Sequence, residues 1–588
     1  MHPQSDNRGI PIGLPKKTRF QRFVRSLSKI VQNDQGVPES VIGAVLARWC
    51  LRKYSGLPRS GLLASRALRD DPAIITFVDF INTCELLEAM YWLASAYAQL
   101  IGDGHRKKLA MFFTPPSLTK RLLDDLAAAG ADFASLRFCD PACGGAAFLV
   151  PIAIRMRDAL RAKGAKPGQI LEHVQAHLIG IDINKTLCKL SRHFLLMALH
   201  DEIVATGVVP HFQVIQGDSL QQVPYLVGAM DVVVCNPPYR KMLASEVATY
   251  FTEFSYIIEA QPNLYALFIA LCVKLLVPGG TCALVTPTSF LSGQYFSKLR
   301  TFLITQTKVL SIGMVSERQG VFIDVQQETA LTLVRREYNV HALSTVADVC
   351  VISRDGNYVN VGKCFLPNSG ASWPIPRKES DVALLRRAAK ALAHLTDYGY
   401  AVRIGCFVWN RDTRPTYVSA KSAARAKGGS AVPLLWASDI AADECLRFDG
   451  LPKANKEPCF VNLGSLLHRS VIRRPSVLLQ RVTSNEQSKR LVAAVVPKEI
   501  FDSYGGFVGE NHIVILEQVA PEPALSPAQL AQLLGTPTVN RYFRCISGAI
   551  NVSSFELNQL RLPNPDRLKQ YLAQGYNIAE AAKRAWDG

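Results

Sequence analysis

The sequence predicts an α/β protein in which a parallel sheet, covered by helices on both faces, fills the middle of the chain. Short apolar runs of strand length alternate with helical patterns between residues 118 and 285. Before that stretch the apolar spacing is helical, and beyond about residue 340 the alternation ends. A chain of 588 residues is too long for one core. We expect a basic arm and helical lobe at 1–110, the sheet domain at 111–340 and a mixed α+β domain at 341–588.

The first expected element is a loose arm, because about the first 35 residues are polar and basic and are interrupted by Pro and Gly. Residues 39–69 and 80–100 then carry apolar residues three and four positions apart, which is the helical period. These two stretches predict the small helical lobe.

The sheet domain is expected to alternate between helices and strands. Its expected helices are 118–129, 146–162, 185–205 and 264–276, and its expected strands are 136–139, 178–181, 212–215, 231–235 and 282–285. A sheet of this kind binds its ligand at the carboxyl ends of the strands. The residues that carry chemistry should therefore follow directly after the strands.

The last part of the chain is expected to fold separately. It carries short β-like runs at 402–409, 476–482 and 513–516 and a Pro-rich linker at 521–527. These features predict a mixed α+β domain.

Composition and charge narrow the function. With 48% hydrophobic and 19% charged residues, the chain is neither wholly disordered nor collagen-like nor a coiled coil. The net charge of +18 divides into +7, +2 and +9 over the three expected domains. A nearly neutral domain between basic flanks is typical of a catalytic domain held on a polyanion, whose phosphates Lys and Arg neutralise. Simple solubility is the alternative explanation.

Cysteine usage and hydropathy bear on the compartment. The 14 Cys include no CxxC pair and several lie inside apolar runs, which predicts a reducing compartment and no zinc site. The N-terminus lacks the apolar segment of a signal peptide, and the longest apolar helical stretch, 264–277, is too short to span a bilayer. We expect a cytoplasmic protein with no membrane partner and no metal.

Three expected strands are followed by residues suited to ligand binding. The loop that starts at Asp140 reads Asp-Pro-Ala-Cys-Gly-Gly, and its small residues would let backbone N–H groups approach a ligand, although a tight turn explains it equally well. Asp182 could accept both hydroxyls of a ribose, or cap a helix. Asp218 could accept from an adenine amino group, or form a turn.

The fourth strand, 231–235, leads into Asn236-Pro237-Pro238-Tyr239. Because the two prolines fix φ and remove two donors, the turn is rigid and directs the Asn amide oxygen and the following carbonyl outward. Two adjacent acceptors can hold both hydrogens of an exocyclic amino group, and the Tyr ring can stack on a base. Taken alone, the tetrapeptide could be a plain proline turn, but at the end of the fourth strand it predicts transfer of a group to an amino nitrogen.

The order of these segments resembles the adenine-N6 DNA methyltransferases of the gamma arrangement, as found in type II restriction-modification systems. Phe113-Thr114-Pro115-Pro116 matches their cofactor-pocket motif, and Gly320-Val321-Phe322 resembles the last motif of their catalytic domain. The resemblance covers about residues 111–335. It implies a Rossmann-like S-adenosylmethionine-dependent methyltransferase domain, with a target-recognition domain C-terminal to it. The 42 residues from Asp140 to Asp182 depart from the family and imply a longer first helix or an inserted loop around 163–168.

The resemblance also implies residue roles. Asn236, Pro237, Pro238, Tyr239 and Phe322 would act on the target adenine, with Tyr239 and Phe322 on either face of a base rotated out of the duplex. The residues implied to bind S-adenosylmethionine are Phe113, Thr114, Pro115, Asp140, Ala142, Cys143, Gly144, Asp182, Ile183, Asp218, Ser219, Asn236 and Phe268.

The expected partner is double-stranded DNA, with a separately encoded restriction endonuclease as a second candidate. DNA contacts are expected from the basic C-terminal domain, with Arg reading guanine edges and Lys contacting phosphates. The candidates are Arg469, Arg473, Arg474, Arg481, Lys489, Arg490, Arg541 and Arg544. An amino-directed methyltransferase of RNA or of a protein glutamine is one alternative, and an inactive DNA-binding subunit is another.

Overall fold

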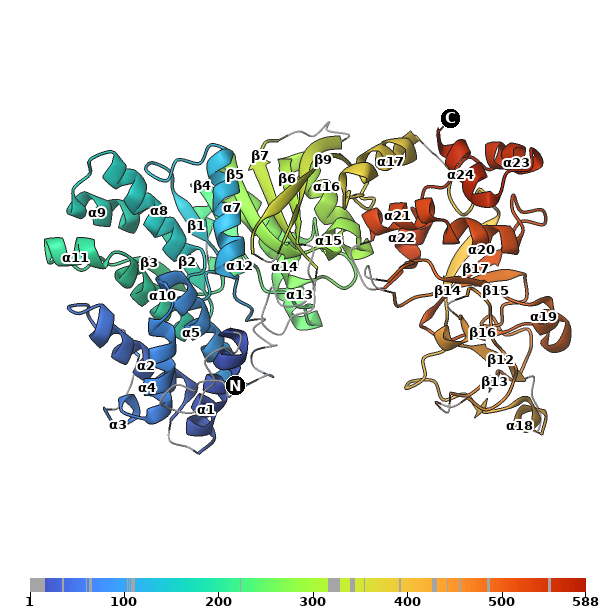
Figure 1. The fold of residues 1–588 in the computed structure, drawn as a ribbon, viewed down its shortest axis with the longest axis horizontal. Coiled ribbons are helices and arrows are strands. Elements are labelled where there is room, and N and C mark those ends of the chain that lie inside the picture. The colour runs from blue at the N-terminus through green and yellow to red at the C-terminus, as the bar shows by residue number, and fades with distance from the viewer. Residues whose placement is uncertain are drawn as a thin grey trace, which may run out of the picture. The chain divides into compact units, whose positions relative to one another are not determined.

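The computed structural model forms two compact units (Figure 1). Unit 1 comprises Met1–Pro287 and Lys298–Val359, and unit 2 comprises Thr288–Ser297 and Asn360–Gly588. The structure describes residues 16–33, 36–59, 61–62, 66–102, 104, 106, 111–222, 224–315, 328–338, 344–353, 355–390, 393–425, 431–441, 443–453, 455, 457–483, 487–547 and 551–587.

Unit 1 begins with a group of helices, which are α1 (Lys16–Gln32), α2 (Pro38–Lys53), α3 (Arg66–Arg69), α4 (Pro72–Asn82) and α5 (Leu86–Leu100). The helical lobe is therefore present, but the expectation of a loose arm is wrong for residues 16–32. The reason is the spacing of Phe20, Phe23, Leu27 and Ile30, which places all four side chains on the buried face of α1. The basic residues between them made the segment look unstructured in the sequence.

Eight strands of a nine-stranded sheet form the centre of unit 1, and most of the ninth, β9, is counted with unit 2; the strand order is β3-β2-β1-β4-β5-β7-β6-β8-β9. The first five strands in this order run parallel, and β7 pairs antiparallel with β5 and with β6. The strands are β1 (Phe138–Asp140), β2 (Leu178–Asp182), β3 (Gln213–Gln216), β4 (Met230–Cys235), β5 (Leu276–Pro287), β6 (Thr307–Val315), β7 (Thr329–Arg336), β8 (Ser344–Ile352) and β9 (Tyr358–Pro367). The five strands expected from the sequence correspond to β1–β5.

Helices cover both faces of the sheet. On one face, α7, α8 and α10 share a single core with the N-terminal helices and with β4 and β5; α14 packs on the other face. This division is expected, because successive right-handed crossovers toward opposite edges place their helices on opposite faces. The helices are α7 (Pro116–Ala128), α8 (Leu149–Ala162), α9 (Pro167–His177), α10 (Lys185–Ala198), α11 (His200–Thr206), α12 (Ser219–Gln222), α13 (Ala244–Phe254), α14 (Leu264–Leu275) and α16 (Ser297–Gln306).

Several of these helices have no counterpart in the sequence analysis, and two of them, α9 and α13, are close to the residues expected to carry chemistry. The long step between Asp140 and Asp182 is neither one long helix nor a plain loop, because α9 fills it and leads into β2. The second, α13, follows the Asn-Pro-Pro-Tyr turn and buries only Phe254.

The division into compact units differs from the expected three domains. The N-terminal helices do not stand alone, because the core that contains Phe20 also contains residues of α7, α8 and α10. Strand β8 pairs in parallel with β6, so the sheet of unit 1 continues past residue 340.

Unit 2 contains two four-stranded sheets, in the orders β10-β17-β14-β15 and β11-β13-β12-β16. The strand runs expected from the sequence correspond to β10, β14 and β17, and α20 packs on β14 and β15. The strands are β10 (Tyr400–Ile404), β11 (Thr416–Tyr417), β12 (Ala431–Leu435), β13 (Phe460–Asn462), β14 (Ser476–Gln480), β15 (Ala493–Val495), β16 (Val508–Gly509) and β17 (Ile513–Gln518). The helices are α15 (Ser289–Ser292), α17 (Glu379–Lys390), α18 (Ala420–Ala424), α19 (Lys498–Tyr504), α20 (Pro527–Gly535), α21 (Pro537–Ile546), α22 (Ser554–Asn558), α23 (Pro565–Ala573) and α24 (Ile578–Asp587).

The Pro-rich segment 521–527 is a packed turn of unit 2, not a linker between domains. Leu525 is buried in the unit's core, and the backbone N–H of Ala524 donates to Tyr398 O at 3.1 Å. Proline content alone does not distinguish a packed turn from a linker.

Candidate active site

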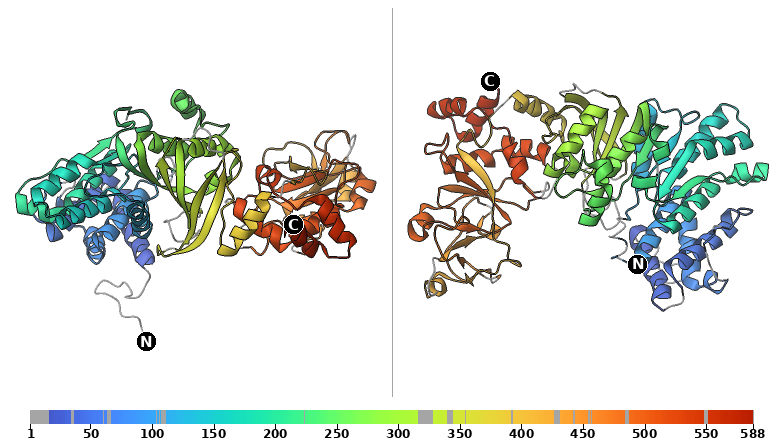
Figure 2. Two further views of the ribbon diagram at one scale, coloured as in Figure 1. Left: turned by 90° about the horizontal axis from the view of Figure 1, so that it is seen from above. Right: turned by 180° about the vertical axis from the view of Figure 1, so that it is seen from behind.

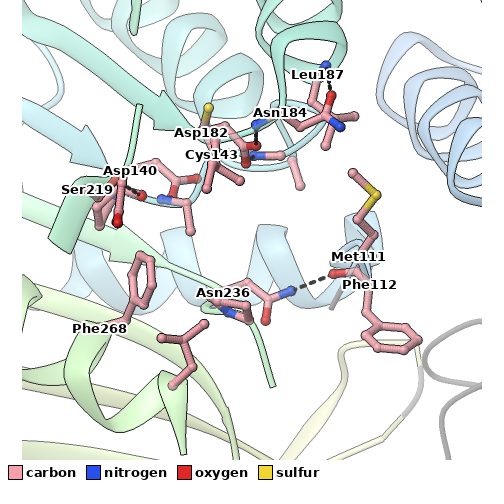
Figure 3. A pocket seen from close by; sticks show the side chains of 18 of the residues that line it. Met111, Phe112, Asp140, Cys143, Asp182, Asn184, Leu187, Ser219, Asn236 and Phe268 are labelled. Carbon is pink, nitrogen blue, oxygen red and sulfur yellow. Dashed lines mark hydrogen bonds between the residues drawn. The ribbon is translucent and has the colours of Figure 1, made fainter. Parts of the chain in front are cut away.

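A pocket lies at the carboxyl ends of the parallel strands of unit 1. The strand order reverses between β1 and β4, and this is the point at which open α/β sheets bind ligands. The pocket encloses about 1000 Å³, including its open mouth. Figure 3 shows side chains from the ends of several strands around one cavity. The lining residues are Met111, Phe112, Phe113, Thr114, Asp140, Pro141, Ala142, Cys143, Gly144, Ala147, Phe148, Asp182, Ile183, Asn184, Leu187, Gly217, Asp218, Ser219, Leu220, Asn236, Pro238, Arg240, Tyr250, Leu264 and Phe268.

The loop after β1 forms one wall of the pocket. Asp140 accepts from Ala142 N at 3.0 Å, and Cys143 N donates to Ile181 O at 2.9 Å, so the loop is fixed to β2. Gly144 has φ of 50°, a conformation that favours glycine, and a Cβ there would stand 3.3 Å from the Phe113 ring. The loop therefore needs a small residue at this position. Burial also raises the pKa of Asp140 well above its usual value.

Asp182 lies at the end of β2 with both carboxylate oxygens facing backbone donors. Oδ2 accepts from Gly144 N at 2.9 Å, and Oδ1 accepts from Asn184 N at 2.7 Å. Burial raises the pKa of Asp182 to about 6, although both hydrogen bonds favour the charged form. Each carboxylate oxygen has further lone-pair capacity, so Asp182 can accept from a ligand while it holds the loop.

Asp218 and Ser219 follow β3 on the same side of the pocket. Ser219 Oγ donates to Pro141 O at 2.5 Å, which joins this turn to the loop after β1. Asp218 Oδ1 accepts from Leu220 N at 3.0 Å, and Oδ2 accepts from Tyr250 Oη at 2.6 Å. The two carboxylates expected from the sequence therefore line one pocket, at the ends of neighbouring strands.

Asn236 is held at the end of β4 by three hydrogen bonds. Its Nδ2 donates to Phe112 O at 3.1 Å and to Thr114 Oγ1 at 2.9 Å. The bond to Phe112 is drawn in Figure 3. Its Oδ1 accepts from Tyr239 Oη at 2.5 Å. Phe112 and the adjoining Phe-Thr-Pro-Pro segment thus set the orientation of the amide, with its nitrogen toward residues 112–114.

Tyr239 differs from the open platform that the sequence suggested. Its hydroxyl donates to Asn236 Oδ1 and also lies 2.8 Å from Val285 O, and its ring packs edge-on against Tyr265. Burial raises the pKa of this hydroxyl well above its usual value. The Asn-Pro-Pro-Tyr turn places Tyr239 three residues after Asn236, where its hydroxyl reaches Asn236 Oδ1, and Val285 of β5 supplies the second acceptor. In this structure, Tyr239 supports Asn236 and does not line the pocket.

Most of the expected site residues come together, with a few exceptions. Pro115 precedes α7 as its N-cap residue, and neither it nor Pro237 lines the pocket. Phe322 lies outside the described residues. The pocket also includes Leu187, Arg240, Tyr250 and Leu264, which the sequence analysis did not single out. For Tyr250 the sequence holds no signal, because its position depends on how α13 returns to the pocket.

The expected DNA-contact residues of unit 2 have varied surroundings. Arg469 is exposed. Lys489 pairs with Glu444 at 2.5 Å, and Arg541 pairs with Asp381 at 2.7 Å. The remaining arginines at 473, 474, 481 and 544 donate to backbone carbonyls of unit 2.

Arg490 contradicts the expectation of a surface contact. Its side chain is fully buried, with 0% exposure, and donates to Thr483 O and to Ser547 Oγ. A guanidinium in this position cannot reach a phosphate without leaving the core of unit 2. Its place in a basic run of the sequence gave no indication of this burial.

No group of three or more His, Cys, Asp or Glu side chains among the described residues could hold a metal ion. No helix in the described part of the chain is both long and apolar enough to cross a membrane.

Residues 87–363 match the family N-6 DNA Methylase. The curated relatives include the type II methyltransferase M.BsuBI of Bacillus subtilis, 23% identical over 57% of this chain and 65% of that protein. They also include the type II methyltransferase M.PstI of Providencia stuartii, 25% identical over 58% of this chain and 66% of that protein. The chain thus aligns with just under two thirds of the length of each relative. Among solved structures, the type IIL restriction-modification enzyme MmeI in complex with DNA shares the fold, with a TM-score of 0.52 and 12% identity over 97% of this chain and 91% of MmeI.

Proposed function

We propose, because residues 87–363 match the family N-6 DNA Methylase, that this chain methylates the N6 amino group of adenine in duplex DNA. The observation that carries the proposal is the place of Asn236, whose amide lines the same pocket as Asp182 and Asp218. Its Nδ2 is fixed by residues 112–114, so its oxygen has one defined direction.

The pocket suits S-adenosylmethionine as the methyl donor. Two of its carboxylates, Asp182 and Asp218, follow neighbouring strands. This spacing suits a ligand that presents ribose hydroxyls to one carboxylate and an amino group to the other. Phe268 and Ile183 add apolar walls, and the glycine of the loop after β1 allows close approach. The sulfonium of the donor supplies an already activated methyl group.

The residues of this chain then supply binding and orientation. Asp182 would accept from the ribose hydroxyls, and Asp218 from the amino group of the cofactor's adenine. The Asn236 oxygen would accept one hydrogen of the target amino group in the pocket. The carbonyl of Pro237, which follows Asn236 but does not itself line the pocket, would accept the other once the base has entered. An amide oxygen can accept two hydrogen bonds, so Asn236 keeps one free acceptor position while Tyr239 occupies the other.

The assignment of DNA as the substrate rests on the shape of the pocket and on the positive charge of the chain. A target base inside a duplex cannot reach such a pocket, so it must rotate out of the stack. The excess of +9 over residues 341–588 supports a role of this part of the chain in holding DNA through its phosphates. We further propose that the chain is the modification component of a restriction-modification system with a separately encoded endonuclease. We also propose that it belongs to the gamma arrangement of adenine-N6 DNA methyltransferases, as the order of its motifs implies.

The direct test supplies purified protein with S-adenosylmethionine whose methyl group carries deuterium, together with plasmid DNA, total RNA or protein. After digestion, mass spectrometry should find the labelled methyl in N6-methyldeoxyadenosine. Label in RNA guanosine or in protein glutamine, with none in DNA, would contradict the proposal.

Cofactor affinity should depend on pH through Asp182. Its pKa of about 6 in the folded protein lies above the usual 3.8, so the folded state favours the protonated carboxyl between these values. A ribose that donates two hydrogen bonds favours the ionised form. Affinity for S-adenosylhomocysteine, the product of methyl transfer, should therefore be level above pH 6 and weaken by up to about tenfold per pH unit below it.

Calorimetric titrations of the product between pH 5 and 7.5 check this dependence. The Asp182→Asn variant cannot titrate at this position. It should bind the product more weakly, and its affinity should not change with pH below pH 6. If the affinity of the wild type were the same from pH 5 to 7.5, cofactor binding would not depend on the ionisation of Asp182, and this prediction would be refuted.

Arg490 and Arg469 should respond differently to substitution. Arg490→Met leaves Thr483 O and Ser547 Oγ without their buried donor and should lower the free energy of unfolding by about 3 kcal/mol. Arg469→Met should leave the thermal midpoint unchanged and weaken DNA binding in a salt-dependent manner.

Thermal unfolding measures the stability of both variants, and fluorescence anisotropy with a labelled duplex measures their DNA binding. An Arg490→Met protein of normal stability would contradict the structural role.

A further inference from the structure

The helix α13 brings a side chain to the pocket that the proposed mechanism does not use. Figure 2 shows α13 in green, projecting from the rest of unit 1. Only Phe254 of its residues is buried, so few apolar contacts hold it. Polar contacts hold it instead: Lys274 Nζ donates to Glu253 O at 3.2 Å, and two further ties lead toward the pocket. Arg240 forms a two-pronged ion pair with Glu246, at 2.6 and 2.7 Å, and Tyr250 Oη donates to Asp218 Oδ2 at 2.6 Å.

Both ties lead to residues that line the pocket. Arg240 directly follows the Asn-Pro-Pro-Tyr turn, and Asp218 follows β3. Tyr250 itself lines the pocket beside Asp218. Burial, with the bond to Asp218 as a smaller cause, raises the pKa of Tyr250, so its hydroxyl keeps the proton that it donates.

Two donors fix the plane of the Asp218 carboxylate. Leu220 N holds Oδ1, and Tyr250 Oη holds Oδ2. With the backbone donor alone, the carboxylate could rotate about its last bond, and this freedom would be lost again when a ligand binds. Each oxygen still has one acceptor position, which is what an amino group needs.

We propose that Tyr250 is a positioning residue, which holds Asp218 ready for the adenine amino group of the methyl donor and so strengthens selection for adenine. This inference rests on the proposed function. A fixed acceptor favours a ligand that donates at that position and disfavours one that presents an oxygen there, because two acceptors then face each other. An acceptor that can turn away discriminates less.

The test measures the binding of two ligands by calorimetry to the full-length chain. One is S-adenosylhomocysteine, and the other is its inosine analogue, in which a carbonyl oxygen replaces the amino group. In Tyr250→Phe, affinity for the adenosine ligand should fall about tenfold, while affinity for the inosine analogue changes by less than about twofold. The preference for adenosine should therefore fall by a similar factor.

Tyr256→Phe is the matched control, because Tyr256 lies just beyond α13, is 39% exposed and does not line the pocket. It should retain the wild-type affinities, and both variants should keep the wild-type thermal midpoint. An unchanged preference in Tyr250→Phe, or tighter binding of both ligands, would overturn the role of Tyr250. If the wild type binds neither ligand, the proposed function itself fails.

Discussion

Asn236→Ala is expected to lower the rate of methyl transfer by at least about 100-fold, because it removes an oriented acceptor for the target amino group. In the structure, Nδ2 donates to Phe112 O and Thr114 Oγ1, so the amide cannot turn its nitrogen toward the substrate without breaking both bonds. The oxygen therefore has a fixed position before the base arrives, and this pre-alignment contributes most in the transition state.

The cofactor affinity of Asn236→Ala should stay within about threefold of wild type, because binding depends mainly on Asp182 and Asp218. Single-turnover rates and calorimetry with S-adenosylhomocysteine separate these two effects. The matched control is Asn33→Ala, at an exposed position beyond α1. Near-normal turnover of Asn236→Ala would contradict the role assigned to the amide.

Asp182→Ala is expected to weaken cofactor binding by about 100-fold or more. The substitution removes the acceptor for two ribose hydroxyls, and each hydrogen bond to a charged group contributes about 1.5–3 kcal/mol. It also leaves Gly144 N and Asn184 N without their acceptor, so the loop after β1 loses its tie to the end of β2. The lost acceptor and the loosened loop should both weaken the binding of the cofactor.

Equilibrium binding of S-adenosylhomocysteine measures this loss, and circular dichroism checks that the fold remains. Asp201→Ala provides the control, because the Asp201 side chain on α11 is 79% exposed. Binding of Asp182→Ala within threefold of wild type would exclude the assigned role, whatever the effect on turnover.

The sequence predicted the sheet and the pocket well because both depend on local patterns. Strands β1 to β5 follow from short apolar runs, and parallel strands must place their carboxyl ends together. Asp182, Asp218 and Asn236 therefore had to converge once the strand order was in place. Their convergence needed no knowledge of side-chain contacts.

Other features depend on tertiary contacts that a sequence pattern does not contain. The Tyr239 hydroxyl lies on Asn236 because Val285 O and Tyr265 surround it, and both come from later elements. Arg490 is buried through contacts with residues 483 and 547, which lie 7 and 57 positions away. Helix α1 was missed for a different reason, since its many basic residues obscured a regular apolar stripe.

The most direct test of the central claim is modification-sensitive sequencing of plasmid DNA from cells that express either the wild type or Asn236→Ala. We expect N6-methyladenine at one short sequence motif with the wild type and none at that motif with the variant. An unmodified plasmid from cells that contain folded, cofactor-binding wild-type protein would contradict the claim that this chain by itself methylates adenine in DNA.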